Sequence, residues 1–520
     1  MKRSSFSSVC ARCPINRRNF ISRTSLAVAG TFGTLAGPGW LMAAEQKGPT
    51  RIRIIYSLHG EKQEQPDWPN KGFDFKPAME RINQLLAKRC PGFAFTPTLA
   101  TGEAQAKKIL EDDKAAGNID GYLVYQMNCW NRVVQTIATS GKPVLYADFQ
   151  FGGSGGFLVY NAGFLRNNTP NVGFVASSEP EDLVAAVKCF AAVKSGGTNF
   201  AAATAKARLD RTPAMGKLKV EADDLKCLSA DECLKRLKEM KILAVRSQES
   251  GPAGEFFGIK VQQVAFAELN EAWKAADKDE ARAVADKWTK TAAKVEGVNR
   301  ETLETSAAMY LAQKALLKKH GASGITVNCL GGFYGGHIHA YPCLGFHQLL
   351  NEGLVGGCEC DVRSAVTMLA GTTLTQGRPG YISDPVIDTS KDQIIYAHCV
   401  AANKAFGPNG QANPFEILTH SEDRQGASVR SLLPTGQMTT TLEFEQSRKE
   451  ILFHQAVAVA NDLDDRACRT KLCAVPMGDI EKLFREWDGW GWHRVTFYGD
   501  LKESVYALAD KLGWKVVAEA

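Results

Sequence analysis

The sequence of 520 residues lacks the features that mark several other protein classes. After the first 45 positions no stretch approaches the roughly 18 continuous apolar residues of a membrane-spanning helix, so we expect the mature chain to have no membrane anchor. No dense Lys/Arg face with interleaved aromatics is present and the net charge is only +6, so nucleic-acid binding is not expected. The remaining composition, 44% hydrophobic and 23% charged, is typical of a globular protein of roughly two to four domains.

The first 44 residues are predicted to be a twin-arginine signal peptide. Arg17-Arg18 precedes Phe20, a mildly apolar run covers 26–36, and small residues end at Ala43-Ala44. The alternative is an uncleaved membrane anchor, but the apolar run is short and rich in Gly and Thr. We therefore expect export to the periplasm. This route carries folded proteins, which hints at a cofactor loaded before export.

Cysteines are present but do not form a zinc-site pattern. Of 14 cysteines, Cys10 and Cys13 lie in the signal, which leaves 14 − 2 = 12. A structural zinc site would need two CxxC-type pairs, and none occurs. The exported compartment permits disulfides, and the close pairs Cys227/Cys233 and Cys468/Cys473 could each close a small loop.

The order of strand-like and helix-like segments predicts the fold class. From 50 to 170 they alternate, which indicates a parallel sheet covered by helices. A second α/β unit is expected over 171–340. From 341 to 520 the segments shorten and Gly, Thr and Pro become denser. The chain is thus predicted to be α/β, with two tandem doubly wound parallel-sheet domains followed by a strand-rich α+β, barrel-like C-terminal domain.

Two carboxylates stand out in the stretch "GGCECDVRSAVTMLAGTTLTQGRPGYISDP". Glu359 is expected on a strand among Gly, Val and Cys, and Asp384 follows "PGYI". A carboxylate in apolar surroundings needs a partner, because an unpaired buried charge is costly. A divalent metal is one candidate partner. The other candidates are nearby arginines: Arg363, Arg378, Arg424 and Arg430.

Histidines concentrate in the last third of the chain. Seven of the nine lie at or after His337. An oxygen-rich site with one imidazole suits Mn²⁺, Mg²⁺ or Co²⁺. His337 and His339, in "GGHIHAYP", could bind a metal from a strand or contact substrate from a loop.

The stretch from "YPCLGFHQLLNEGLVGGCECD" to "GYISDPV" resembles the L-fucose/L-arabinose isomerase superfamily. There, Glu-x-Asp is followed by an apolar helix and a second Asp; here the separation is 384 − 359 = 25 residues. The resemblance implies that Glu359 and Asp384 hold Mn²⁺ (or Mg²⁺ or Co²⁺) and form the acid/base pair. It also implies that His398 and His493 complete the metal shell, and that the protein is a homo-oligomer, with hexamers the family's tendency.

The implied reaction is an aldose–ketose isomerisation of a small-molecule sugar through an enediol. A metal stabilises the developing negative charge, and two carboxylates are needed because a proton leaves one atom and arrives at another. Trp487, Trp490 and Trp492, in "REWDGWGWH", could form a stacking wall for the sugar or could be core packing. We expect Trp490, Trp492, His337 and His339 to contact the substrate.

Three other functions compete with this interpretation. Two tandem α/β units also describe an exported sugar-binding protein without catalysis. A redox enzyme would use "GGSGG" (152–156) as a phosphate loop, but no GxGxxG pattern supports this. A nucleophile elbow at Ser154 would require a helix after it, whereas "FLVYNAG" (157–163) is predicted to be a strand.

Overall fold

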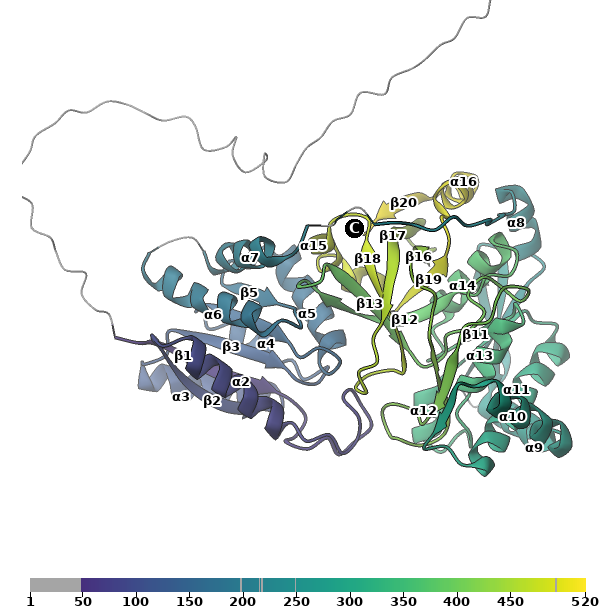
Figure 1. Cartoon of the computed structure of the whole chain (residues 1–520), viewed down its shortest axis with the longest axis horizontal. Helices are drawn as coiled ribbons and strands as arrows, with labels where there is room; N and C mark the ends of the chain where they lie inside the picture. The colour runs from purple at the N-terminus through teal and green to yellow at the C-terminus, as the bar shows by residue number, and fades with distance from the viewer. Residues whose placement is uncertain (1–47, 197–198, 215, 217, 248, 492) are drawn as a thin grey trace, which may run out of the picture. The chain divides into compact units, whose positions relative to one another are not determined.

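The computed structural model describes residues 48–196, 199–214, 216, 218–247, 249–491 and 493–520 (Figure 1). The predicted signal at 1–44 lies outside these residues, so export stays a prediction. Within the described chain, no helix is both long enough and apolar enough to cross a membrane. Residues Pro49–Ala520 form one compact unit built around three main sheets.

The first sheet has five parallel strands in the order β2-β1-β3-β4-β5. In β1, Ile54 and Tyr56 face one hydrophobic core and Ile55 faces the other. Because both faces are buried at the centre of the sheet, β3 and β4 are nearly continuous buried runs. The strands are β1 (Thr50–Ser57), β2 (Phe93–Ala100), β3 (Gly121–Gln126), β4 (Val144–Asp148) and β5 (Val172–Val175). The sheet therefore extends past residue 170, where the sequence places a boundary.

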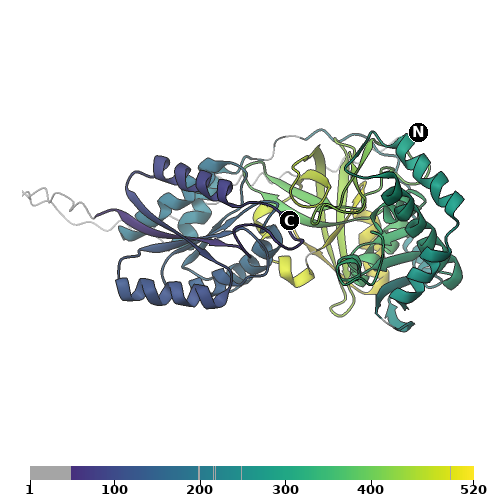
Figure 2. The ribbon, with the colours of Figure 1, turned by 90° about the horizontal axis from the view of Figure 1, so that it is seen from below.

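Helices cover both faces of this sheet, as Figure 2 shows for the purple and blue part of the chain. One core receives side chains from α3 (Glu103–Ala116), α4 (Val133–Ala138) and α5 (Ser154–Arg166). The other core receives them from α2 (Lys76–Arg89), α6 (Pro180–Lys194) and α7 (Phe200–Arg211).

The strand predicted over 157–163 is wrong, because these residues lie in α5. Phe157, Leu158, Asn161 and Ala162 are buried, at the spacing of one helical face. A short apolar run fits a buried strand or a buried helix equally well, so its local sequence could not distinguish them.

The second sheet has the order β11-β10-β6-β8-β7, with parallel pairing except for the antiparallel edge strand β7. Its strands are β6 (Lys241–Ser247), β7 (Gly251–Phe256), β8 (Ile259–Ala265), β10 (Gly324–Val327) and β11 (Val355–Gly357). The accompanying helices are α8 (Ala230–Leu237), α9 (Phe266–Ala275), α10 (Lys278–Thr291), α11 (Arg300–His320), α12 (Cys329–Tyr334) and α13 (Cys343–Asn351).

The C-terminal region contains a closed antiparallel barrel of six strands. The order β16-β19-β12-β13-β18-β17 closes because β17 also pairs with β16. The strands are β12 (Tyr381–Asp388), β13 (Gln393–His398), β16 (Met438–Glu445), β17 (Glu450–Asn461), β18 (Thr470–Pro476) and β19 (Arg494–Tyr498). Parallel sheets and a barrel-like C-terminal region in a mixed α/β protein are thus confirmed.

The buried helix α14 (Val362–Leu374) joins the second sheet to the barrel. Gly371 permits this packing, because a Cβ there would lie 2.1 Å from the Phe497 ring on β19. The remaining elements are β9 (Lys294–Glu296), β14 (Phe415–Leu418), β15 (Ser428–Ser431), α15 (Ile480–Leu483), η1 (Trp487–Trp490), α16 (Lys502–Leu512) and β20 (Lys515–Ala518). All twelve described cysteines are free thiols, so neither close pair forms a disulfide.

Candidate metal and active site

Glu359 lies in a tight turn between β11 and α14 rather than on the expected strand. Its φ is 60° and that of Cys360 is 52°, the left-handed region that non-glycine residues seldom adopt. Asp361 then caps α14 by accepting a hydrogen bond from the Ser364 backbone N–H at 3.0 Å. Such backbone strain costs on the order of 1–3 kcal/mol per residue and clusters at functional sites.

Three neighbouring barrel strands carry the other predicted ligands. Asp384 on β12 pairs with Ala397 on β13, so it lies beside His398 at the end of that strand. On the other side of β12, Ser383 pairs with Arg494, which places His493 next to Asp384. The antiparallel register thus brings Asp384, His398 and His493, which span 493 − 384 = 109 residues of sequence, to the same end of the barrel.

The structure brings together all four residues that the sequence proposes as metal ligands. One ligand atom from each of Glu359, Asp384, His398 and His493 lies within 4.8 Å of the others. His493 Nε2 is 3.6 Å from Glu359 Oε2 and 3.4 Å from Asp384 Oδ1. Two carboxylates and two imidazoles could hold a divalent metal ion.

The buried His398 ring fits a ligand role. Its Nε2 is buried and has no hydrogen-bond partner in the described part of the chain, an arrangement that a bound cation would satisfy. Its Nδ1 accepts a hydrogen bond from the Cys399 backbone N–H at 2.9 Å. Ligation through Nε2 would therefore move the ring proton to Nδ1, in place of that hydrogen bond.

Asp361 orients His493, a role that the sequence analysis missed. Its Oδ2 lies 2.9 Å from His493 Nδ1 and also accepts the Ser364 hydroxyl at 2.8 Å. A carboxylate behind a histidine fixes the ring and directs the other nitrogen at a metal. The Glu-x-Asp spacing in the sequence was the available signal for this residue.

Burial and charge shift the titration of this cluster. Burial raises the pKa of Asp384 to about 8, an effect that Glu359 and Glu422 reinforce and His493 opposes. Burial alone would lower the pKa of His493, but Asp384 and Asp361 raise it to about 10. Burial lowers the pKa of His398 to about 3. A metal ion bound by His493 would therefore have to displace its proton, so we expect metal affinity to rise with pH.

A cavity of about 330 Å³ opens beside the cluster, within the size range of small-molecule sites. Glu359 and Asp384 line it, together with aromatic, acidic and small residues from the first sheet's loops, α12 and the barrel region. These additional lining residues are Pro66, Asp67, Trp68, Cys129, Trp130, Gly155, Leu330, Tyr334 and Glu422.

The first sheet places its loops at this cavity for a topological reason. Its strand order reverses between β1 and β3, and ligands of such sheets bind beyond the carboxyl ends of the strands at that point. Trp68 follows β1 and Trp130 follows β3, and both line the cavity. The strand prediction contained this signal, but the aromatic residues were not selected from it.

Three of the four residues expected to contact substrate do not line this cavity. His337 and His339 are exposed, and their rings pack against Phe266 and Trp273 of α9. Trp490 is 4% exposed and lies under the Arg448 guanidinium. None of the three is among the described residues that line the cavity. Trp492 lies outside the described residues.

Ser154 is not placed as a nucleophile. A nucleophile elbow requires a helix after the serine, and α5 does begin at Ser154, so the expected strand after Ser154 is wrong. However, Ser154 is fully buried and its hydroxyl donates to Asp148 at 2.9 Å. Gly153 is required by close packing, because a Cβ there would lie 2.0 Å from the Gln126 carbonyl oxygen.

Asp361→Asn should weaken metal binding by about 10- to 100-fold, the usual cost of losing a partner behind a ligand. Asparagine still caps a helix, so α14 should remain folded. Titration calorimetry with Mn²⁺ on the purified protein measures the change. Asp277→Asn is the matched control, because Asp277 caps α10 in the same way, accepting from Glu280 N at 2.8 Å. Equal affinities in both variants would contradict the orienting role.

The chain is similar at low identity to sulfoquinovose isomerases. It is 28% identical over 214 residues to that of Clostridium sp. (strain MSTE9), covering 39% of this chain and 46% of the relative. With the Priestia aryabhattai protein it shares 24% over 312 residues, covering 55% and 66%. The matches therefore span about half to two thirds of these relatives. Sulfoquinovose isomerases belong to the L-fucose/L-arabinose isomerase-like superfamily, which supports the resemblance at that level.

No protein-family profile matches this chain. Among solved structures, a solute-binding protein of a Burkholderia multivorans ABC transporter matches with a TM-score of 0.16 and 13% identity, covering 56% of this chain and 85% of that one. A Bacillus halodurans solute-binding protein with bound myo-inositol matches with a TM-score of 0.18 and 15% identity, covering 63% and 89%. Scores this low carry no argument about fold or function.

Proposed function

We propose that this protein is a divalent-metal-dependent aldose–ketose isomerase. The observation that carries the proposal is the convergence of Glu359, Asp384, His398 and His493 at the edge of a cavity of small-molecule size. The similarity to sulfoquinovose isomerases supports the same reaction class. A sugar-binding protein without catalysis would have no need for two carboxylates beside two imidazoles.

In the proposed site, Glu359, Asp384, His398 and His493 would hold the metal, with Mn²⁺ as the first candidate and Mg²⁺ or Co²⁺ as alternatives. Such a cation supplies positive charge that stabilises negative charge developing on the C1 and C2 oxygens of the sugar. Asp361 Oδ2 lies 2.9 Å from His493 Nδ1 and keeps the His493 ring in its orientation. Trp68 and Trp130 provide flat apolar faces on which a sugar ring can stack.

Two carboxylates divide the proton transfers of an aldose–ketose conversion. One takes the proton from C2 and returns it at C1, while the other moves a proton from O2 to O1. Glu359 and Asp384 both line the cavity and can reach a bound sugar there. Their side chains are 24% and 22% exposed, unlike the buried imidazoles behind them.

We propose an uncharged aldose as the substrate. Among the described lining residues, four carry carboxyl groups (Asp67, Glu359, Asp384 and Glu422), and none is Lys or Arg. An anionic sulfonate would find no cationic partner in this wall and would be repelled by like charge. Homo-oligomer assembly, which the family resemblance implies, and export to the periplasm, which the N-terminal residues indicate, are further proposals.

The test measures ketose formation from D-glucose, L-fucose, L-arabinose and sulfoquinovose in the presence of Mn²⁺. At least one neutral aldose should be converted, with a kcat/KM at least about tenfold above that for sulfoquinovose, a difference of roughly 1.4 kcal/mol. Activity should vanish after chelation and return with added Mn²⁺. No ketose from any of the four sugars would refute the isomerase. A preference for sulfoquinovose would refute only the neutral substrate.

A further inference from the structure

Two carboxyl groups outside the metal cluster, those of Asp67 and Glu422, line the cavity, and Asp67 is engaged with His59, its Oδ2 lying 3.3 Å from His59 Nδ1. Glu422 lines the same cavity as Glu359 and Asp384. It does not belong to the group whose ligand atoms lie within 4.8 Å of one another. A metal in that group would therefore leave the Glu422 carboxyl available for another task in the same cavity.

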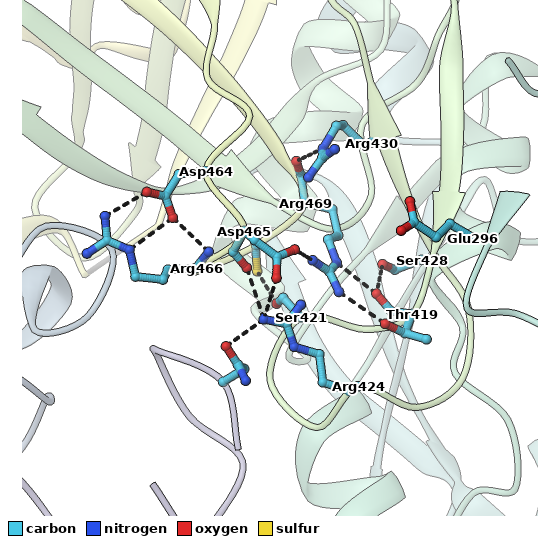
Figure 3. Close-up of polar contacts among 12 residues, drawn as sticks. Glu296, Thr419, Ser421, Arg424, Ser428, Arg430, Asp464, Asp465, Arg466 and Arg469 are labelled. Atoms are coloured by element: carbon cyan, nitrogen blue, oxygen red, sulfur yellow. Dashed lines mark hydrogen bonds and ion pairs between the residues drawn. The ribbon is translucent and has the colours of Figure 1, made fainter. Parts of the chain in front are cut away.

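Several contacts fix the position of Glu422. The Tyr334 hydroxyl donates to its Oε2 at 3.0 Å, and its backbone carbonyl accepts from the Lys71 backbone N–H at 2.6 Å. Figure 3 shows the adjoining network, in which Asp465 bridges Arg424 and Arg469. Arg469 also donates from Nε to the Thr419 carbonyl at 2.8 Å, so both sides of the 419–424 segment are held.

The proposed reaction contains a step that the metal cluster does not supply. Aldoses in water are mainly cyclic, and enediol chemistry requires the open chain with a free carbonyl at C1. Opening the ring needs one proton removed from the O1 hydroxyl and one delivered to the ring oxygen O5. A positioned carboxyl group can accept and donate these protons with its two oxygens.

We propose that Glu422 is the catalytic residue for ring opening, an inference that rests on the proposed isomerase function. The protonated carboxyl donates its proton to O5 while its other oxygen takes the proton from O1–H. The C1–O5 bond breaks with its electron pair going to O5, and the C1=O1 double bond forms. Glu422 ends in the acid form in which it began, so no other reactant is needed. Tyr334 holds the carboxyl in place.

Anomer exchange measures this step without isomerisation. Freshly dissolved α-D-glucose, α-L-fucose and β-L-arabinose are followed by polarimetry with the full-length protein carrying Mg²⁺. The wild-type protein should accelerate mutarotation of at least one sugar above the buffer rate. Glu422→Gln should lower the protein-catalysed rate by about 100-fold or more, the scale of general acid–base catalysis. Tyr334→Phe should lower it by a smaller factor.

D-glyceraldehyde separates ring opening from isomerisation, because it cannot close a ring on itself. Glu422→Gln should convert it to dihydroxyacetone within about twofold of the wild-type kcat/KM, while its kcat/KM for the cyclic aldose falls. Glu352→Gln is the matched control, because Glu352 also accepts from a tyrosine hydroxyl, that of Tyr310, but lies outside the cavity. It should leave both rates unchanged.

Two outcomes would overturn the assignment of Glu422. One is wild-type mutarotation no faster than buffer, or equal to that of Glu422→Gln. The other is an equal loss with glyceraldehyde and with the cyclic aldose, which would indicate a general defect. Failure of the isomerase proposal would look different. If mutarotation depends on Glu422 but no ketose forms, the ring-opening role of Glu422 stands and only the isomerisation is refuted.

Discussion

Glu359→Gln is expected to lose its bound metal and to reduce kcat/KM for aldose conversion by on the order of 10³-fold or more. The amide removes one of four converging ligands and one of the two groups that transfer protons, and a single acid–base group already contributes on the order of 10²–10⁴-fold. Glutamine has the same shape and can keep the backbone with φ 60°. The fold should therefore survive, and the loss should be chemical.

Metal content by mass spectrometry and ketose production together test this prediction. Glu304→Gln is a suitable control, because this residue forms an ordinary helix-surface ion pair with Arg300. The control should retain wild-type metal and activity. A Glu359→Gln protein with full metal content and unreduced turnover would exclude the proposed centre. A sugar-binding protein without catalysis would instead bind sugar whether or not the metal is present.

Glu519→Gln is expected to destabilise the fold by about 3–5 kcal/mol, the usual cost of removing one partner of a buried ion pair. Glu519 and Arg494 are both fully buried at the side chain, with Arg494 Nε donating to Glu519 Oε1 at 2.9 Å. The other carboxylate oxygen lies 2.7 Å from His454 Nδ1. The next-to-last residue of the chain thus neutralises an arginine inside the C-terminal region.

The same contact should affect the metal site. Arg494 donates to the carbonyls of His493 and Gly491, so it fixes the segment that carries one proposed ligand. We therefore expect the Glu519→Gln variant to bind Mn²⁺ more weakly and to unfold at a lower urea concentration than the wild type. Glu503→Gln, an exposed residue of α16, should change neither quantity. Unchanged stability would show that Arg494 is satisfied without Glu519.

The pH dependence of this stability has a defined sign. Burial alone would raise the pKa of Glu519, but the charge of Arg494 and the hydrogen bond from His454 lower it to about 2, from an ordinary 4.5. A depressed pKa in the folded state stabilises the protein above the unfolded pKa. The difference in the free energy of unfolding between wild type and Glu519→Gln should have its maximum value above about pH 5. It should shrink as the pH falls towards 2.

Local patterns were sufficient where a structural element is determined by its own residues. The strands and helices from 50 to 150 follow from apolar runs and amphipathic periodicity. The four proposed ligands were selected from residue type and resemblance alone. They do converge in the structure, although metal binding itself stays a proposal.

Where several long-range packing solutions fit the same residues, the sequence was insufficient. The run 157–163 became α5 because its apolar face packs against the first sheet. Trp490 was selected from a cluster of tryptophans, but it is buried under Arg448, and Trp68 and Trp130 line the cavity instead. Neither the helix at 157–163 nor the choice of cavity-lining tryptophans is determined by residues adjacent in the sequence.

Residue chemistry and periodicity determined the α/β class and the barrel-like last third, and residue type together with the family resemblance supplied four residues that could bind one cation. Only the tertiary structure decided that Asp361 supports His493, that Glu422 faces the cavity, and that the loops after β1 and β3 form its wall. The physical reason is that strand register and packing of distant elements set which side chains meet, and these depend on contacts between residues far apart in sequence.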